Sequence, residues 1–394
     1  MLNKFRLLTP GPTPLPERVR LVLARDMIHH RKSEFKEIMG QVQQSLQTLF
    51  GTSGTVLPLS CSGTGAMTAA VYNLFAPGQK VLVIDGGKFS QRWSEIALSR
   101  GLEVETIPVP WGQAVRPEAV EAALKADPSI AGVLIQLSET STGVLHPVEA
   151  VARITRESQA LLVVDGISAV GLSPCPMDAW GVDCLLTGSQ KGLMLPPGLA
   201  LLALSGRAWA CAEKQTPGCF YFNLVKEREN VLKGQTCFTS PVGLILGLKE
   251  SLDMLLENGL KPVYAKQWAL TMLTRAGLSA MGLELFAKKD FAWGITSVLL
   301  PDGVDGTKVL RLAQEKHGVC MAGGQDHYKG RMARIGHMGW VDWADVAAGL
   351  YALNDSLRAV GGYSGSRDYL EQGMAAYRAA LEGRPGAPLP QVYS

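Results

Sequence analysis

The sequence lacks long apolar runs, paired cysteines and blocks of like charge. Its apolar runs fall short of the roughly 20 residues that span a bilayer, and its start has no signal-peptide h-region. The seven cysteines show no Cys-x-x-Cys spacing, which argues against a zinc ribbon or a disulfide framework and favours a reducing, cytoplasmic compartment. The net charge of +3 comes without a basic block, so nucleic acid and membrane are not expected partners.

Internal repeats and low-complexity tracts are also missing, which leaves 394 residues for folded domains. Hydrophobic residues make up 47% and charged residues 19%, as is typical of a soluble globular enzyme. A chain of this length favours two domains. We expect an N-terminal arm at 1–20, a large domain at 21–260 and a small domain at 261–394. The Pro-rich stretch 9–14 is either a disordered lead or a rigid arm.

Strand and helix patterns alternate over much of the chain. Apolar runs predict strands at 56–59, 81–85, 104–107, 133–136, 161–164, 184–186 and 199–203, with helices among them at 67–75, 90–100, 117–125 and 147–158. This alternation predicts an α/β fold whose mostly parallel sheet is covered by helices on both faces. Two long helices at 241–258 and 263–276 lead to a smaller α+β domain, and the last dozen residues are expected to be a loop.

Lys191 stands in a turn of small residues after an apolar run, and Asp165 ends the apolar run before it. Strand ends in an open α/β sheet meet in one crevice, so the acid and the amine are expected together. Pyridoxal phosphate needs such a pair: a lysine for the Schiff base and a carboxylate that keeps the pyridine nitrogen protonated. Taken singly, Asp165 could be a helix N-cap and Lys191 a surface lysine.

The segment 62–66, Ser-Gly-Thr-Gly-Ala, lies between a predicted strand and a predicted helix. Free N–H groups at a helix start, with hydroxyls and glycines beside them, can bind a phosphate. The spacing matches neither GxGxxG nor GxxxxGK[ST], so both nucleotide fingerprints are excluded. A plain tight turn is the alternative, but Asp165 and Lys191 favour a phosphate.

Three more side chains suit such a site. Phe89 could stack on a planar ring or pack in the core. Thr140 could meet a ring hydroxyl or cap a loop. Arg334 lies in an apolar strand, where burial favours an anionic partner: a substrate carboxylate, or the acid of an internal salt bridge. The histidines show no metal-ligand spacing, so no metal site is predicted.

Cys320 requires a separate interpretation, because a nucleophilic cysteine this far beyond Lys191 would suggest a desulfurase. It lies between Val319 and Met321 in an apolar run. These flanks favour a buried strand in which the cysteine acts as a small hydrophobe.

Several motifs, in order over residues 7–345, resemble the class V (fold type I) pyridoxal-phosphate aminotransferases, in particular the alanine–glyoxylate and serine–pyruvate aminotransferase group. They are Thr-Pro-Gly-Pro at 9–12, Ser-Gly-Thr-Gly at 62–65, Ser-Thr-Gly at 141–143, Val-Asp at 164–165, Gly-Ser-Gln-Lys at 188–191, Pro-Pro-Gly at 196–198 and Arg-Ile-Gly at 334–336. Gly-Ser-Gln-Lys followed by Pro-Pro-Gly is the most specific. The resemblance implies a seven-stranded, mostly parallel sheet between helices.

The resemblance also implies roles for individual residues. Lys191 would form the internal aldimine, Asp165 would bind the pyridine nitrogen, and Thr140 would meet the ring 3-hydroxyl. Phe89 would lie over the ring, at the position where close relatives have a tryptophan. The residues implied around the phosphate are Thr64, Gly65, Ala66 and Gln190.

Substrate and partner contacts follow in the same way. Arg334 would clamp the substrate carboxylate, with Gly11 packed near it. Family members are homodimers that share active sites, and Thr239 stands where a contact to the partner's phosphate would come from. Thr236 stands where some relatives carry a tyrosine with that role.

The expected activity is a ping-pong transamination through a Lys191 Schiff base. An amino group would move from alanine, serine or aspartate to a small 2-oxo acid such as glyoxylate or pyruvate. Two alternatives stay open: a pyridoxal-phosphate lyase or desulfurase on the same fold, and a non-catalytic subunit of a larger assembly.

Overall fold

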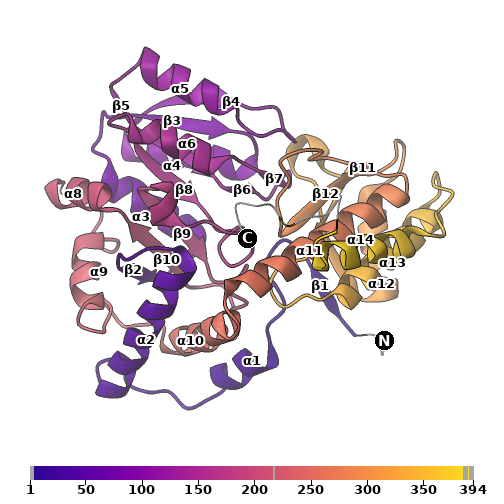
Figure 1. Ribbon diagram of the computed structural model, residues 1–394, viewed down its shortest axis with the longest axis horizontal. Helices are drawn as coiled ribbons and strands as arrows, with labels where there is room; N and C mark the ends of the chain where they lie inside the picture. Colours follow the sequence, from indigo (N-terminus) through magenta and orange to yellow (C-terminus); the bar gives the residue numbers. More distant parts are fainter. Residues whose placement is uncertain (1–3, 216–217, 385–388, 390–394) are drawn as a thin grey trace.

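The computed structural model describes residues 4–215, 218–384 and 389, and its strands form two main sheets (Figure 1). The larger sheet has seven strands in the order β2-β10-β9-β8-β5-β3-β4. They are β2 (Val56–Leu59), β3 (Lys80–Asp85), β4 (Glu103–Pro108), β5 (Ile130–Gln136), β8 (Leu161–Asp165), β9 (Cys184–Gly188) and β10 (Ala200–Leu204). β10 runs antiparallel to both neighbours and the other adjacent pairs are parallel. The predicted mostly parallel sheet is confirmed.

Helices cover both faces of this sheet because its inner strands are apolar on both sides. One layer consists of α1 (Glu17–Leu23), α2 (Ser33–Phe50), α5 (Pro117–Ala126), α6 (Val148–Arg156), α7 (Met177–Trp180) and α10 (Val242–Leu256). The other consists of α3 (Gly63–Leu74), α4 (Lys88–Arg100), α8 (Gly206–Lys214) and α9 (Leu224–Val231). Alternate residues of β5 show the division, since Val133 and Ile135 face the first layer and Leu134 the second.

A second lobe follows α11 (Leu260–Ala280), the long helix beside α14 in Figure 1. Its five-stranded sheet has the order β1-β13-β14-β12-β11, formed by β1 (Arg6–Leu8), β11 (Glu284–Leu285), β12 (Ile295–Leu299), β13 (Val319–Gly323) and β14 (Met332–Gly336). The helices α12 (Gly306–His317), α13 (Trp343–Val360) and α14 (Tyr369–Leu381) contribute to a separate apolar core with this sheet. The short strands β6 (Ser138–Glu139) and β7 (Val144–Leu145) pair with each other, and a 3-10 turn spans Asp326–Tyr328.

The predicted N-terminal arm is ordered against both lobes in its described part. β1, which the sequence did not predict, pairs in parallel with β13 and sets Leu7 opposite Cys320. The stretch that follows reaches the turn of Lys191, where the Thr13 N–H donates to the Gln190 carbonyl at 3.2 Å. Residues 1–3 of the arm, and 385–388 and 390–394 of the expected C-terminal loop, lie outside the described residues.

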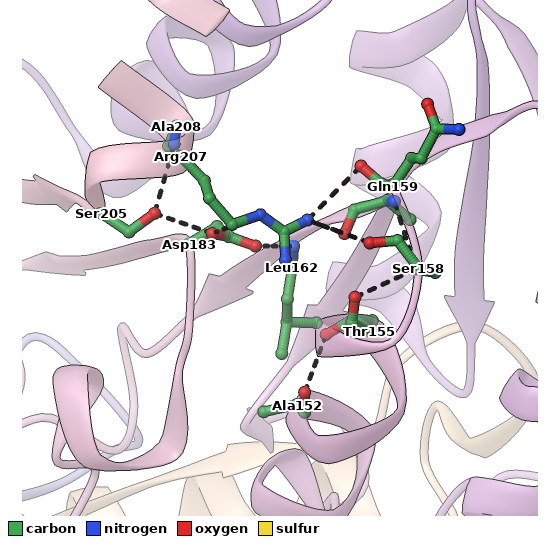
Figure 2. A network of polar contacts seen from close by, with 10 residues as sticks. Ala152, Thr155, Ser158, Gln159, Leu162, Asp183, Ser205, Arg207 and Ala208 are labelled. Atoms are coloured by element: carbon green, nitrogen blue, oxygen red, sulfur yellow. Dashed lines mark hydrogen bonds and ion pairs between the residues drawn. The ribbon is translucent and has the colours of Figure 1, made fainter. Parts of the chain in front are cut away.

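The amino end of β9 is fixed by a polar network around Asp183 (Figure 2). One Asp183 oxygen accepts from the Leu162 N–H at 3.0 Å and the other from the Ser205 hydroxyl at 2.7 Å. Ser205 in turn caps α8 by accepting from the Ala208 N–H at 3.2 Å. This network joins β8, β9 and α8 at the edge of the sheet opposite the carboxyl ends of the strands.

Candidate active site

The carboxyl ends of β8 and β9 bring the predicted acid and amine together. Asp165 is the last residue of β8, whose parallel partner β9 pairs Leu186 with it. Lys191 follows β9 in a turn that the Leu195 N–H closes by donating to the Ser189 carbonyl at 3.1 Å. Both side chains line one pocket, as their positions after neighbouring parallel strands predicted.

The pocket collects side chains from several separate segments. Thr64, Phe89, Thr140, Asp165, Gln190 and Lys191 all line it, together with Ser62, Gly63, Met67, Arg92, Ile167 and Ser168. Six of the predicted site residues therefore meet in one place. Gly65 and Ala66 follow Thr64 in α3 and do not line the pocket.

Asp165 is a buried carboxylate with little local compensation. It is 5% exposed, and its Oδ1 accepts from the Ile167 N–H at 2.8 Å. Burial raises the pKa of Asp165 to about 7, and the charge of Glu139 adds to this, whereas the Ile167 bond and Lys191 oppose it. A cationic N–H group in the pocket would remove this penalty. The protonated ring nitrogen of pyridoxal phosphate is such a group.

Lys191 is held between the sheet and the arm. Burial lowers the pKa of Lys191 to about 8, against the attraction of Asp165. Its Nζ donates to the Pro10 carbonyl, and its own carbonyl accepts from the Thr13 hydroxyl at 3.1 Å. A Cβ atom on Gly11 would lie 2.6 Å from Nζ, so glycine is required where the arm crosses the lysine. The resemblance placed Gly11 near the substrate carboxylate, and in the structure it packs against Lys191.

The glycine-rich segment is not a separate turn before a helix. It is the first turn of α3, which begins at Gly63, four residues earlier than predicted. The hydroxyl of Ser62 does not cap this helix, so the helix start opens to the pocket. Helix starts carry partial positive charge and free N–H groups, which suit a phosphate. Arg92 adds a full positive charge and donates to the Thr64 hydroxyl at 3.0 Å.

Phe89 and Thr140 flank the pocket on different elements. The guanidinium carbon of Arg92 lies 5.1 Å from the centre of the Phe89 ring, within cation–π range. The Thr140 hydroxyl lies 2.8 Å from that of Ser168. An aromatic face on one side and paired hydroxyls on another are what a planar ring with a hydroxyl substituent would need.

Arg334 is 6% exposed and borders the site through Thr140. Its Nε donates to the Gly323 carbonyl at 2.7 Å and its Nη1 to the Thr140 carbonyl at 3.0 Å. Both partners are backbone carbonyls. Burial lowers the pKa of Arg334, and the nearby charge of Glu139 opposes this lowering. Within the described residues the internal salt bridge considered from the sequence is not formed.

Several residues singled out from the sequence lie elsewhere. Thr239 lines a different pocket, with Tyr221 and Phe238, on the surface of the same chain. Cys320 is half-buried in β13, outside the Lys191 pocket, and burial raises its pKa. The predicted strand is present and its flanks Val319 and Met321 are buried, but Cys320 itself is less buried than expected.

Over residues 4–215, 218–384 and 389, no three His, Cys, Asp or Glu side chains gather as metal ligands, and no helix has the length and apolarity to cross a membrane.

Sequence reasoning missed Arg92 and Ser168. Each lies three residues beyond a predicted site residue, Phe89 and Asp165 respectively, and that spacing was the available signal. Arg92 shares a face of α4 with Phe89 because residues three apart are neighbours on a helix.

A seven-stranded, mostly parallel sheet with lysine and aspartate at adjacent strand ends is the architecture of the fold type I pyridoxal-phosphate enzymes. The family model for class-V aminotransferases matches residues 20–354. The chain therefore belongs to the class-V aminotransferase family, whose members depend on pyridoxal phosphate.

Individual relatives carry different names. The chain is 40% identical over 365 residues to a protein of Synechococcus sp. named as the small subunit of a soluble hydrogenase, covering 92% of this chain and 95% of that protein. It is 36% identical over 350 residues to serine–glyoxylate aminotransferase of Methylorubrum extorquens, covering 86% and 87%. The solved alanine–glyoxylate aminotransferase of Nostoc sp. superposes with a TM-score of 0.87 at 29% identity, covering 91% and 96%.

Proposed function

We propose that this protein is a transaminase that moves an amino group from alanine, serine or aspartate to glyoxylate or pyruvate by a ping-pong mechanism. The observation that carries the proposal is the meeting of Lys191 and Asp165 in one pocket at adjacent strand ends. The glyoxylate named for two of the relatives supports the choice of acceptor.

The residues present fit the cofactor. Lys191 would hold it through its amine, Asp165 would pair with the ring nitrogen, and Phe89 would lie against the ring. Thr64, Gln190 and Arg92 would surround the phosphate at the start of α3. When bound, pyridoxal phosphate supplies an electron sink conjugated to the α-carbon of the substrate.

Lys191 has the properties of the base that the reaction needs. Because burial lowers its pKa to about 8, roughly one tenth of the amine is unprotonated at pH 7, far more than for an ordinary lysine. The amine of Lys191 would take the proton from the α-carbon of the substrate. Asp165 would keep positive charge on the ring nitrogen of the bound cofactor, which favours release of that proton.

Arg334 would hold the substrate carboxylate. Its Nε and Nη1 are committed to backbone carbonyls, which fix the plane of the guanidinium. The remaining donors can then receive a carboxylate in a defined orientation. Amino and 2-oxo acids both carry this carboxylate, so one arginine serves both halves of the reaction.

The direct test is the visible spectrum and activity of the purified chain loaded with pyridoxal phosphate. We expect a yellow absorbance band that alanine or serine bleaches and glyoxylate restores. Lys191→Ala should lose the band and the turnover while its far-UV circular dichroism stays that of the wild type. Normal turnover by this variant would refute the assignment.

The desulfurase alternative places Cys320 at the chemistry. Its location in β13, outside the Lys191 pocket, argues against this role. Cys320→Ser should therefore retain nearly all transaminase activity. Sulfide release from cysteine by the wild type, absent from the variant, would favour the desulfurase instead.

A non-catalytic subunit is the second candidate, because two relatives are named as subunits of a soluble hydrogenase. The two functions differ in what the isolated chain can do. Transamination by the chain alone supports the enzyme. A chain that neither binds pyridoxal phosphate nor turns over would support the subunit.

A further inference from the structure

Glu139 is a buried acid that the proposed reaction does not use. It ends β6, is 0% exposed, and precedes Thr140 in the chain. Within the described part of the chain, its carboxylate accepts hydrogen bonds from donors in its own loop and at the start of α4.

The carboxylate joins two segments that line the pocket. On its own loop, Oε1 accepts from the Ser141 N–H at 3.0 Å and from the Ser141 hydroxyl at 2.6 Å. Across the pocket wall, Oε1 accepts from the Phe89 N–H at 3.4 Å and Oε2 from the Ser90 N–H at 3.0 Å. Phe89 and Ser90 belong to the first turn of α4, where N–H groups lack partners within the helix and favour a negative charge.

The two segments also touch directly. The Lys88 N–H donates to the Ser141 hydroxyl at 3.0 Å. A Cβ atom on Gly87 would lie 2.5 Å from both the Glu139 carboxyl carbon and the Ser141 hydroxyl. The close approach of the helix start to the loop therefore requires glycine at 87 and an acceptor at 139.

A carboxylate suits this place better than an amide. The four groups that Glu139 meets are three N–H groups and one hydroxyl, all acting as donors. A carboxylate has only acceptor oxygens, whereas glutamine would turn an NH2 group toward at least one of these donors. Replacing this acid by its isosteric amide thus removes contacts without removing volume.

We infer that Glu139 is a positioning residue that sets Phe89 and Thr140 relative to each other and so fixes the orientation of the cofactor ring. α4 carries Phe89 and Arg92, and the loop carries Thr140, whose carbonyl also accepts from Arg334. One carboxylate thereby aligns the aromatic face, the hydroxyl side and the arginine of the site. This inference rests on the proposed function.

The test compares Glu139→Gln with Asp183→Asn. Asp183 is a matched control because it is also a buried acid that binds a backbone N–H and a serine hydroxyl, but at the opposite edge of the sheet (Figure 2). Three quantities are measured for each: melting temperature of the apo-protein, dissociation constant of pyridoxal phosphate, and circular dichroism of the bound cofactor's visible band. The last reports the orientation of the ring.

Both variants should melt lower than the wild type. Only Glu139→Gln should bind pyridoxal phosphate at least about tenfold more weakly and lose most of the visible circular dichroism. Equal cofactor affinity and equal visible dichroism in Glu139→Gln and wild type would overturn the inference, as would equal losses in the two variants.

A variant that fails to fold does not end the test. Ser141→Ala removes the hydroxyl that links Glu139 to Lys88 and should shift the same two cofactor readouts in the same direction by a smaller factor. If it leaves both unchanged, the inference is wrong. A wild-type chain that itself binds no pyridoxal phosphate would instead refute the proposed function.

Discussion

Asp165 carries a charge that its surroundings do not balance in the apo-protein. Its pKa is raised to about 7, mainly by burial, from an ordinary value of 3.8. Well below pH 3.8 the carboxyl is protonated in both the folded and the unfolded chain, so its effect on stability vanishes. As pH rises from about 4 to about 7, only the unfolded chain ionises freely, and folding becomes less favourable. The full penalty is present above pH 7.

Asp165→Asn should therefore stabilise the apo-protein at pH 8 while it abolishes most activity. The gain in free energy of unfolding is expected to be on the order of 2–4 kcal/mol at pH 8 and near zero at pH 4. Urea unfolding of apo wild type and variant at both pH values measures it. A variant less stable than wild type at pH 8 would mean that Asp165 serves as a structural cap through Ile167.

Arg334→Ala should raise KM for the amino acid and for the 2-oxo acid together, because both present the same carboxylate. The loss of a buried charge-assisted contact corresponds to about 2–3 kcal/mol. Arg334→Lys is the matched variant, since it keeps the charge but loses the planar fork. Unchanged KM values for both substrates in the alanine variant would leave Arg334 a purely structural role toward Gly323 and Thr140.

At the residue scale, sequence reasoning found the groups whose chemistry is unusual for their place. A lysine in a turn and an acid ending an apolar strand are informative wherever they occur. Arg92 and Glu139 are different, because exposed arginines and acids are common. Their importance arises from tertiary contacts with Thr64 and Phe89, which no local pattern encodes.

At the scale of elements, the N-terminal arm that crosses Lys191 leaves little room for a side chain. Gly11 has φ +121° and no room for a Cβ beside the lysine amine. Gly361 at the end of α13 has φ +94° but open space around it. Substitution by alanine would therefore strain the backbone at both positions. Only at Gly11 would the added methyl group also collide with Lys191.

We expect Gly11→Ala to lower kcat at least about tenfold, because it displaces the amine of Lys191. Gly361→Ala should lose stability by about 1 kcal/mol with kcat unchanged. Steady-state kinetics and melting curves of the two variants separate these effects. Equal kcat values for Gly11→Ala and wild type would show that the arm yields without disturbing the lysine.

Helices and strands were predicted correctly where apolar residues formed a clear pattern in the sequence, and they were missed where no such pattern exists. The strands β3, β5 and β8 were predicted within a few residues because each is an uninterrupted apolar run. The first turn of α3 was missed because Gly63 and Gly65 are poor helix formers, and packing overrides that propensity. β1 was missed because a strand of three residues is too short to show an alternation of apolar and polar side chains, and a Pro-rich stretch follows it.

For the whole molecule, the main prediction is that two copies of the chain form a homodimer. Thr239 lies apart from the Lys191 pocket of its own chain. Beside it, Phe220 is 81% exposed and Phe238 is 38% exposed, and the ring of Phe238 stacks on Tyr221. Exposed aromatic rings of this kind are typical of protein interfaces. The resemblance predicts a homodimer in which this surface meets the partner's site.

Mixing two inactive chains tests the shared site. Lys191→Ala and Thr239→Asp chains should form heterodimers in which one site has an intact lysine and an intact Thr239. Activity is expected to recover to about one quarter of wild type after random subunit exchange. Absence of recovery, with exchange demonstrated by differently tagged chains, would mean that each site is built from one chain.

The pairing of β1 with β13 has a consequence for biosynthesis. Arg6 pairs with Val319, so the strand partner of β1 is made 313 residues later. At about 5–20 residues per second, a ribosome needs roughly 15–60 s to cover that distance. During this time Leu7 and Leu8 have no sheet to join. The nascent chain therefore exposes an apolar segment until β13 has been synthesised, and this segment is where a chaperone or an aggregation partner would bind first.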